Sequence, residues 1–167
     1  MEVVGVRIEM PSNQPIVLLK EVEGSRFLPI WVGTHEATAI AFAQQSMTPN
    51  RPLTHDLMSD VLTALDAALI AVHITHLKDG VFYSELSLRG PEGALDPISA
   101  RPSDAIALAM RMKSNIMASG ELLDEVGIDI PERIADQANA GEGGSQDVEL
   151  ERFREFLEQI NPEDFAG

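Results

Sequence analysis

Residues 69–88 read LIAVHITHLKDGVFYSELSL, and this stretch decides the fold class. Its two halves, 69–77 and 81–88, are rich in β-branched and aromatic residues, and Lys78-Asp79-Gly80 joins them. Asp-Gly between two such runs is a strong short-range signal for a β-hairpin. The stretch comes after two helical patterns, so it predicts that strand pairing resumes late in the chain.

Three strands and two helices are expected before this hairpin. Residues 3–10 alternate apolar and polar side chains, and residues 16–22 and 27–32 are apolar runs joined by short polar connections. Short connections of this kind favour antiparallel pairing. Apolar residues then recur at helical spacing over residues 37–43 and 57–68.

A third amphipathic helix is expected from Pro102 to about Lys113, after the hairpin. The order is therefore β-β-β-α-α-β-β-α. This order predicts an α+β fold with a mostly antiparallel or mixed sheet packed with helices, rather than a doubly wound parallel sheet. We assign residues 1–135 to this domain.

Two further segments are expected after the domain. Residues 136–147 contain Gly, Asn, Ser and Gln but no large apolar side chain, which is typical of a flexible linker. An acidic amphipathic helix is predicted over residues 148–161, with apolar residues at helical spacing. Such a face usually completes a core or a homo-oligomer, so this helix could fold onto the body of the domain, onto a second subunit or into a groove on a partner protein. We expect a homo-oligomer, with a dimer as one possibility.

Composition excludes several functional classes. The chain has 167 residues, 12 Lys+Arg against 27 Asp+Glu, a formal charge of −15 and no cysteine. The charge argues against a general electrostatic grip on nucleic acid or anionic membrane, and the missing cysteine excludes a disulfide framework and a thiolate nucleophile. The start lacks signal-peptide features and no apolar run approaches ~20 residues, so we expect a cytoplasmic protein without a membrane partner.

Three expected helices begin with similar chemistry. The segments are Gly33-Thr-His-Glu36, Leu53-Thr-His-Asp56 and Arg101-Pro-Ser-Asp104, and each places an acid in a first helical turn. Taken singly, each acid is most simply explained by helix capping, with Thr34, Thr54 and Ser103 as N-caps and the carboxylates offsetting the helix dipoles.

A functional interpretation arises if these helix ends meet at one edge of the sheet. Carboxylates can hold Mg²⁺ or Mn²⁺, arginines can bind phosphate oxygens, and a histidine can move a proton. The candidate metal ligands are Glu36, Asp56 and Asp104, the candidate phosphate ligands are Arg51 and Arg101, and His55 is the candidate acid or base. Trp31 lies in an apolar strand and is predicted to be a core residue rather than a platform for base stacking.

Four segments match a known family in order. They are LPIWVG at 28–33, RPLTHDL at 51–57, DGVFY at 79–83 and SARPSDAIALA at 99–109. Over roughly residues 1–130 the chain resembles the bifunctional nuclease domain family of bacteria and plants. The resemblance implies a compact α/β domain that cleaves DNA and RNA without marked sequence preference. It points to the same site residues and adds Ser103, which we assign to substrate binding.

Two hypotheses follow. The first is a divalent-metal-dependent nuclease with His55, Asp56 and Asp104 as its catalytic residues. The alternative is a non-catalytic binding or regulatory module that holds an anion or small ligand at the helix N-termini. Carboxylates that converge on one point would favour the enzyme, and acids bonded only to their own helix ends would favour the module.

Overall fold

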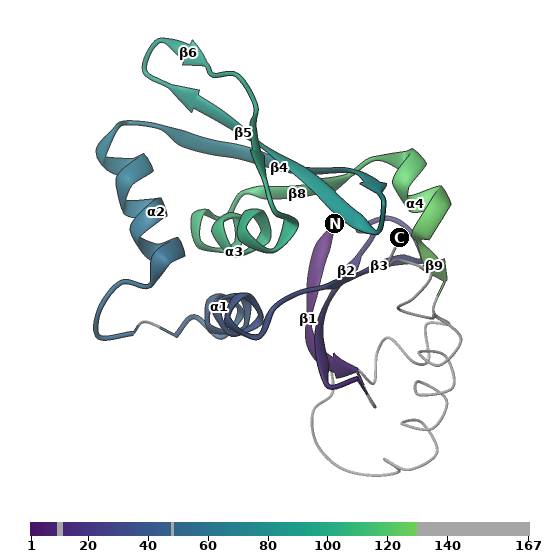
Figure 1. Ribbon diagram of the computed structural model, residues 1–167. Coiled ribbons are helices and arrows are strands. Elements are labelled where there is room, and N and C mark those ends of the chain that lie inside the picture. The colour runs from purple at the N-terminus through teal and green to yellow at the C-terminus, as the bar shows by residue number, and fades with distance from the viewer. Residues whose placement is uncertain (10–11, 48, 130–167) are drawn as a thin grey trace.

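Two β-sheets frame the computed structural model, which describes residues 1–9, 12–47 and 49–129 (Figure 1). The first sheet has the strand order β1-β2-β3-β9, and every pairing in it is antiparallel. Its strands are β1 (Glu2–Glu9), β2 (Gln14–Lys20), β3 (Arg26–Trp31) and β9 (Ile128–Asp129).

The second sheet has the order β6-β5-β4-β8, with β7 also paired to β5. Strand β8 runs parallel to β4 and the other pairs are antiparallel, so this sheet is mixed. Its strands are β4 (Ala68–Lys78), β5 (Val81–Gly90), β6 (Gly93–Ala94), β7 (Ile98–Ala100) and β8 (Asn115–Ala118).

The β4–β5 hairpin confirms the prediction made from Asp-Gly. Lys78 pairs with Val81, which leaves Asp79 and Gly80 as a two-residue turn with φ angles of 50° and 72°. Positive φ at both central residues matches a type I′ turn, whose twist suits a hairpin. The hairpin does not extend the first sheet, because β4 is flanked by β5 and β8 and β3 is flanked by β2 and β9.

Four helices are present in the described residues: α1 (Thr34–Gln44), α2 (Thr54–Ala64), α3 (Pro102–Met112) and α4 (Gly120–Val126). Helix α3 lies between the second sheet and α1, and it also contacts α2 (Figure 1). Its residues 105–109 are at most 1% exposed, and three of those five are alanine. Small side chains allow this close approach of several elements to one helix.

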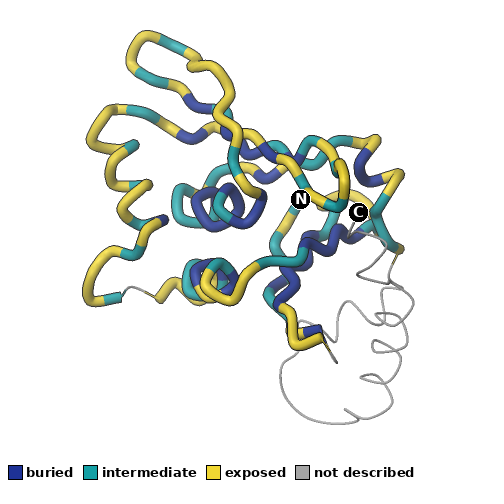
Figure 2. Tube along the Cα trace, viewed as in Figure 1, coloured by how far each residue is buried: buried dark blue, intermediate teal, exposed yellow. Residues whose placement is uncertain are grey.

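One core cluster joins the two sheets through α1 and α3. It contains Val17 and Leu28 from the first sheet, Val72 and Leu86 from the second, and Ile106 from α3. The buried segments therefore lie along α3 and the facing strands, as the dark blue parts of Figure 2 show. This packing fixes α1 and α3 relative to each other, and so fixes where their N-termini lie.

The predicted α+β class and the order β-β-β-α-α-β-β-α are confirmed. The structure adds β6, β7, β8, α4 and β9, whose short segments gave no clear periodicity. The predicted linker 136–147 and helix 148–161 lie outside the described residues. Among the helices that the structure describes, none is both long and apolar enough to cross a membrane.

The predicted capping hydroxyls are wrong. The N-cap positions are Gly33, Leu53 and Arg101, and none of them makes a side-chain capping bond. Thr34 and Thr54 are instead the first helical residues, while Pro102 occupies the first position of α3 as expected. The predicted acids in the first helical turns are confirmed.

Candidate functional site

The third helical position of α1, α2 and α3 is an acid in each case: Glu36, Asp56 and Asp104. Helix α3 packs against both α1 and α2, so the tertiary structure brings the three helix starts into one region (Figure 1). The side chains do not all meet there. Glu36 and Asp104 share one arginine, whereas Asp56 pairs with another.

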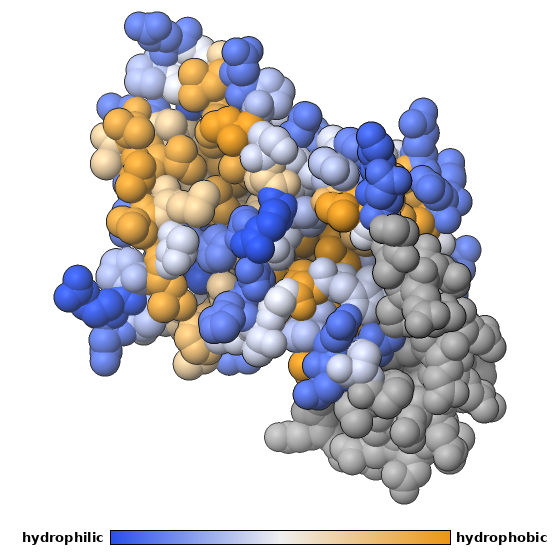
Figure 3. All heavy atoms as spheres, viewed as in Figure 1, coloured by the Kyte–Doolittle hydropathy of each residue, from blue (hydrophilic) through white to orange (hydrophobic). Residues whose placement is uncertain are grey.

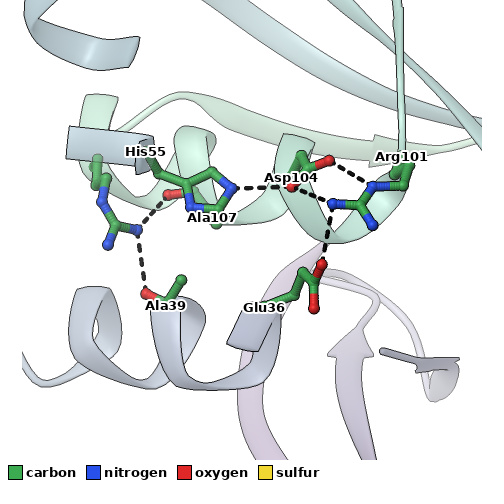
Figure 4. Close-up of polar contacts among 7 residues, drawn as sticks. Glu36, Ala39, His55, Arg101, Asp104 and Ala107 are labelled. Carbon is green, nitrogen blue, oxygen red and sulfur yellow. Dashed lines mark hydrogen bonds and ion pairs between the residues drawn. The ribbon is translucent and has the colours of Figure 1, made fainter. Parts of the chain in front are cut away.

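A line of polar contacts runs from His55 through Asp104 and Arg101 to Glu36 (Figure 4). The Nε2 atom of His55 lies 3.0 Å from Oδ1 of Asp104. Arg101 donates to the same carboxylate from Nε at 2.7 Å and from Nη2 at 3.1 Å. That Nη2 atom also lies 3.0 Å from Oε1 of Glu36. One guanidinium thus bridges the carboxylates of two helices.

Burial decreases from His55 to Arg101 and increases again at Glu36, whose side chain is 21% exposed. The His55 side chain is 9% exposed, that of Asp104 is 27% exposed and that of Arg101 is 66% exposed. Burial raises the pKa of Asp104, but the hydrogen bonds from Arg101 and His55 and the charge of Arg101 lower it by more. The pKa of this carboxyl therefore lies below its ordinary value, so Asp104 is ionised at neutral pH. Arg101 is the most exposed member of the line.

Asp56 belongs to a separate buried contact. Its Oδ1 accepts a hydrogen bond from Nε of Arg111 at 2.5 Å, and its Oδ2 accepts one from the Leu53 backbone N–H at 2.8 Å. Burial raises the pKa of Asp56, but the bonds from Arg111 and Leu53 and the Arg111 charge together lower it below its ordinary value. Asp56 therefore caps α2 and pairs with α3.

Arg111 is a residue that the sequence reasoning missed. Its Nη1 donates to the carbonyl oxygens of Ala39 at 3.1 Å and of Ala107 at 2.9 Å, and Figure 4 draws both bonds. With the bond to Asp56, this side chain joins α1, α2 and α3. The spacing of the sequence could have indicated it. Arg111 lies two helical turns after Asp104, which places both on the same face of the predicted helix.

The expected three-carboxylate metal site does not fit this arrangement. The point where Glu36 and Asp104 meet is taken by the Arg101 guanidinium, and Asp56 is bound to Arg111. Within residues 1–9, 12–47 and 49–129, no group of three or more His, Asp or Glu side chains is placed to hold a metal ion.

A pocket of about 410 Å³ adjoins the Arg101 and Glu36 end of the polar line. Glu36, Arg101 and Ser103 line it, together with residues of the β3 end and of the β4–β5 turn. His55, Asp56, Asp104 and Arg51 are not among its lining residues. Three of the seven predicted site residues thus face one cavity. Arg51 is exposed in the segment that precedes α2.

Two polar groups at this pocket are accessible to a ligand. Ser103 is 8% exposed, and its hydroxyl has no hydrogen-bond partner among the described residues. The bonds and ion pairs of Arg101 involve its Nε and Nη2 atoms, which leaves the two N–H groups of Nη1 available. Both groups suit an oxygen-rich anion at the start of α3.

The prediction that Trp31 is a core residue is wrong. Trp31 is only partly buried and belongs to neither hydrophobic core cluster. Its indole N–H donates to Oε2 of Glu9 at 3.1 Å, and the residue lines the same pocket as Arg101. The apolar strand pattern did not reveal this because Trp31 ends β3, where the strand leaves the core.

Comparisons with known proteins agree with the sequence motifs. A family model described as the bifunctional nuclease domain matches residues 17–131. Two relatives are the uncharacterized proteins MT1877 and Rv1829 of Mycobacterium tuberculosis, from strains CDC 1551 / Oshkosh and ATCC 25618 / H37Rv. Each is 42% identical over 167 residues, which is 100% of this chain and 98% of the relative.

Proposed function

This chain belongs to the bifunctional nuclease domain family, and from that premise we propose that it hydrolyses phosphodiester bonds in DNA and RNA at the pocket beside Arg101. The single observation that carries this proposal is the meeting of Arg101, Ser103 and Glu36 at one cavity. These side chains supply a cation, a hydroxyl donor and a carboxylate, which are the groups that phosphoryl chemistry uses.

Arg101 and Ser103 are the proposed phosphate ligands. The free N–H groups of Arg101 Nη1 and the Ser103 hydroxyl can each donate to a phosphate oxygen. The first-turn N–H groups of α3 face the same end of the helix, and the α3 N-cap has no side-chain bond that would occupy them. The negative charge that develops on the phosphate is therefore stabilised by donors that are already in place.

Glu36 is the proposed base, because it is the carboxylate of the polar line that faces the pocket. In the proposed step, a water molecule attacks phosphorus, Glu36 accepts the proton of that water, and the bond from phosphorus to the leaving oxygen breaks. The leaving oxygen takes its proton from solvent. The step consumes one water and yields a phosphate monoester end and a hydroxyl end.

His55 and Asp104 are assigned to positioning rather than to proton transfer. His55 is buried and does not line the pocket, so its contact is with Asp104 and not with a bound phosphate. Asp104 in turn holds Arg101 through two hydrogen bonds. A guanidinium held in this way loses little freedom when it binds phosphate, which favours the bound state.

A requirement for Mg²⁺ or Mn²⁺ stays a prediction. A metal held by Glu36 and Asp104 would need Arg101 to leave its place between them, because that guanidinium contacts both carboxylates. Direct binding of phosphate by Arg101 and binding of a metal ion in its place make opposite predictions for an Arg101 variant. Loss of Arg101 should abolish cleavage if it binds the phosphate directly, and should preserve cleavage if its place is taken by a metal ion.

The decisive assay measures cleavage of labelled single-stranded DNA and RNA by the full chain, with Mg²⁺, with Mn²⁺ and with a chelator. We expect cleavage by the native protein and a loss of about 100-fold in Arg101→Gln, the scale seen when one donor to developing charge is removed. Arg89→Gln is the matched control, because Arg89 is exposed on β5 outside the pocket. Equal cleavage by both variants that requires Mg²⁺ or Mn²⁺ would favour a metal ion in the place of Arg101. Equal cleavage that persists in the chelator would show that the site is misplaced or that a contaminant cuts.

The alternative is a binding module that uses the same pocket without chemistry. The observation that favours it is the neutralisation of Glu36 and Asp104 by Arg101, which resembles a structural ion-pair junction. An anion bound at the pocket of a protein that cuts neither substrate under any of the metal conditions would support the module.

A homo-oligomer and a cytoplasmic location also stay predictions, as does a protein partner for the helix expected over residues 148–161. Helix α2 offers a surface on which to test the oligomer. Leu57, Val61 and Leu65 follow one stripe along it and are 56%, 48% and 64% exposed. Figure 3 shows apolar residues gathered on the side of the molecule where α2 lies. Contiguous exposed apolar patches often mark association surfaces.

A further inference from the structure

We propose that the pocket takes one unpaired nucleotide, with its phosphate on Arg101 and Ser103 and its base against the aromatic residues Trp31 and Phe82. This inference rests on the proposed function and adds the class of ligand. It concerns whether the pocket recognises a base and an unpaired strand. The groups assigned to hydrolysis contact only the phosphate and water, so they do not determine this.

The polar end of the pocket fits one phosphate. Ser103 is the informative residue. Only 8% of it is exposed, and because no fully buried side-chain N or O atom of the described residues lacks a partner, its hydroxyl oxygen must be accessible from the cavity. Here it lines a cavity and has no partner among the described residues. Arg101 supplies the charge beside it, so an anionic oxygen would satisfy both groups at once.

The remainder of the pocket is mostly apolar. Ile30, Val32, Phe82 and Pro102 line it, and Trp31 adds a second aromatic residue. Ligand sites of roughly 300–1,000 Å³ typically combine such walls with a few polar groups that fix orientation. The volume of about 410 Å³ lies in this range and suits a single nucleotide rather than a longer segment.

The composition of the pocket favours an unpaired base. A base in a duplex presents only its edge, whereas an unpaired base offers a flat face that packs on aromatic side chains. A duplex is otherwise held by a row of cations, and the lining residues of this pocket include a single one, Arg101. The formal charge of −15 means that long-range electrostatics do not attract a polyanion to this protein. Binding affinity must therefore come from local contacts to one nucleotide.

Trp31 makes the inference directly testable, because it is the only tryptophan of the 167-residue chain. Its fluorescence in the full chain reports on this pocket alone. We would titrate the protein with 2′-deoxyadenosine 5′-monophosphate, with 2′-deoxyadenosine and with inorganic phosphate. We expect saturable quenching by the nucleotide, and affinities about tenfold weaker for the nucleoside and for phosphate, since each lacks one half of the contacts.

Two variants separate the two halves of the site, with affinity measured by calorimetry. Trp31→Ala should weaken nucleotide binding about tenfold and leave phosphate binding unchanged, while Trp31→Phe should retain most of the affinity because it keeps an aromatic face. Ser103→Ala should weaken binding of both the nucleotide and phosphate. Ser87→Ala is the matched control, because Ser87 lies on β5 outside the pocket.

Nucleotide and phosphate bound with equal affinity would overturn the inference, and so would nucleotide binding that leaves the Trp31 emission unchanged. The outcome is distinguishable from failure of the proposed nuclease activity. Quenching by a nucleotide in a protein that cuts nothing would uphold the pocket and reject the enzyme. Cleavage that depends on Arg101 without preference for the nucleotide over phosphate would uphold the enzyme and reject the base site.

Discussion

The guanidinium of Arg111 holds the carboxylate of Asp56, with Nε of the arginine 2.5 Å from Oδ1 of the aspartate. The contact joins the last turn of α3 to the first turn of α2, and Arg111 also bonds to Ala39 of α1. Asp56 adjoins His55, and Ala39 lies one turn after Glu36 on α1. The geometry of the candidate site therefore depends on an ion pair that lies outside its pocket.

Arg111→Met should lower the free energy of unfolding by about 3 kcal/mol or more, because it leaves Asp56 as an unpaired, mostly buried charge. The Arg111 side chain is 10% exposed and that of Asp56 is 27% exposed. Chemical denaturation at neutral pH measures the change, with Arg89→Met as an exposed control. A loss below about 1 kcal/mol, the range of surface ion pairs, would contradict this role.

The double variant Arg111→Met with Asp56→Leu should recover part of that stability. Replacing both partners removes the uncompensated charge, which is the main cost of the single change. Asp56→Leu also removes the hydrogen bond that Asp56 accepts from the Leu53 backbone N–H. The double variant should therefore recover only part of the lost unfolding free energy. A double variant as unstable as the sum of the two single variants would show that the residues do not act as a pair.

Asp56→Asn and Asp104→Asn should have different effects. Asp56→Asn weakens the pair with Arg111 and should reduce stability more than it reduces cleavage per folded molecule. Asp104→Asn weakens the two hydrogen bonds that position Arg101. It should lower kcat/KM about tenfold or more under conditions in which the variant is fully folded. Cleavage rates measured below the unfolding transition of each variant test the difference. Equal effects of the two variants on kcat/KM would contradict it.

Acid should destabilise the protein through these two carboxyls. In the folded state the pKa values of Asp56 and Asp104 lie below the ordinary aspartate value of about 4. The unfolded chain therefore binds more protons as pH falls, so their stabilisation is complete above pH ~4 and is lost as pH falls through the folded pKa values. Unfolding free energies from pH 7 to pH 3 should fall less steeply in Asp56→Asn, and an unchanged slope would be inconsistent with the ion pair.

Arg51 and Arg101 should differ in the length of ligand that they affect. Arg51 is exposed outside the pocket, so Arg51→Gln should leave mononucleotide affinity unchanged and raise the KM for a long strand only a few-fold. Arg101→Gln should weaken both. Calorimetry with a mononucleotide and cleavage of a long strand at two salt concentrations test this, and a large loss of mononucleotide affinity in Arg51→Gln would place it in the pocket.

Val61→Asp tests whether α2 joins two copies of the chain. If the exposed stripe is an association surface, a charge at its centre should convert a homo-oligomer to monomers, because the carboxylate would be buried without a partner. Sedimentation of the full chain measures this. Thr63→Asp, at an exposed polar position of the same helix, is the control, and an unchanged oligomer in Val61→Asp would exclude this face.

Local sequence patterns were sufficient for the secondary structure around the site. The Asp79-Gly80 turn follows from backbone preferences of adjacent residues, and the acids at the third position of α1, α2 and α3 follow from helix-end electrostatics. The family was also evident from short ordered segments such as SARPSDAIALA at 99–109. These features depend only on residues close together in the chain.

The pairing of charges was decided by the tertiary structure. Glu36, Asp56 and Asp104 were equivalent ligands as far as the sequence could tell. In the structure α3 packs between the second sheet and α1, and Arg101 at its N-cap and Arg111 in its last turn pair with different acids. Trp31 was predicted to lie in the core, but in the structure it lines the pocket. A charge selects its partner by distance in space, and that distance is fixed by the packing of α3 against its neighbours rather than by separation along the chain.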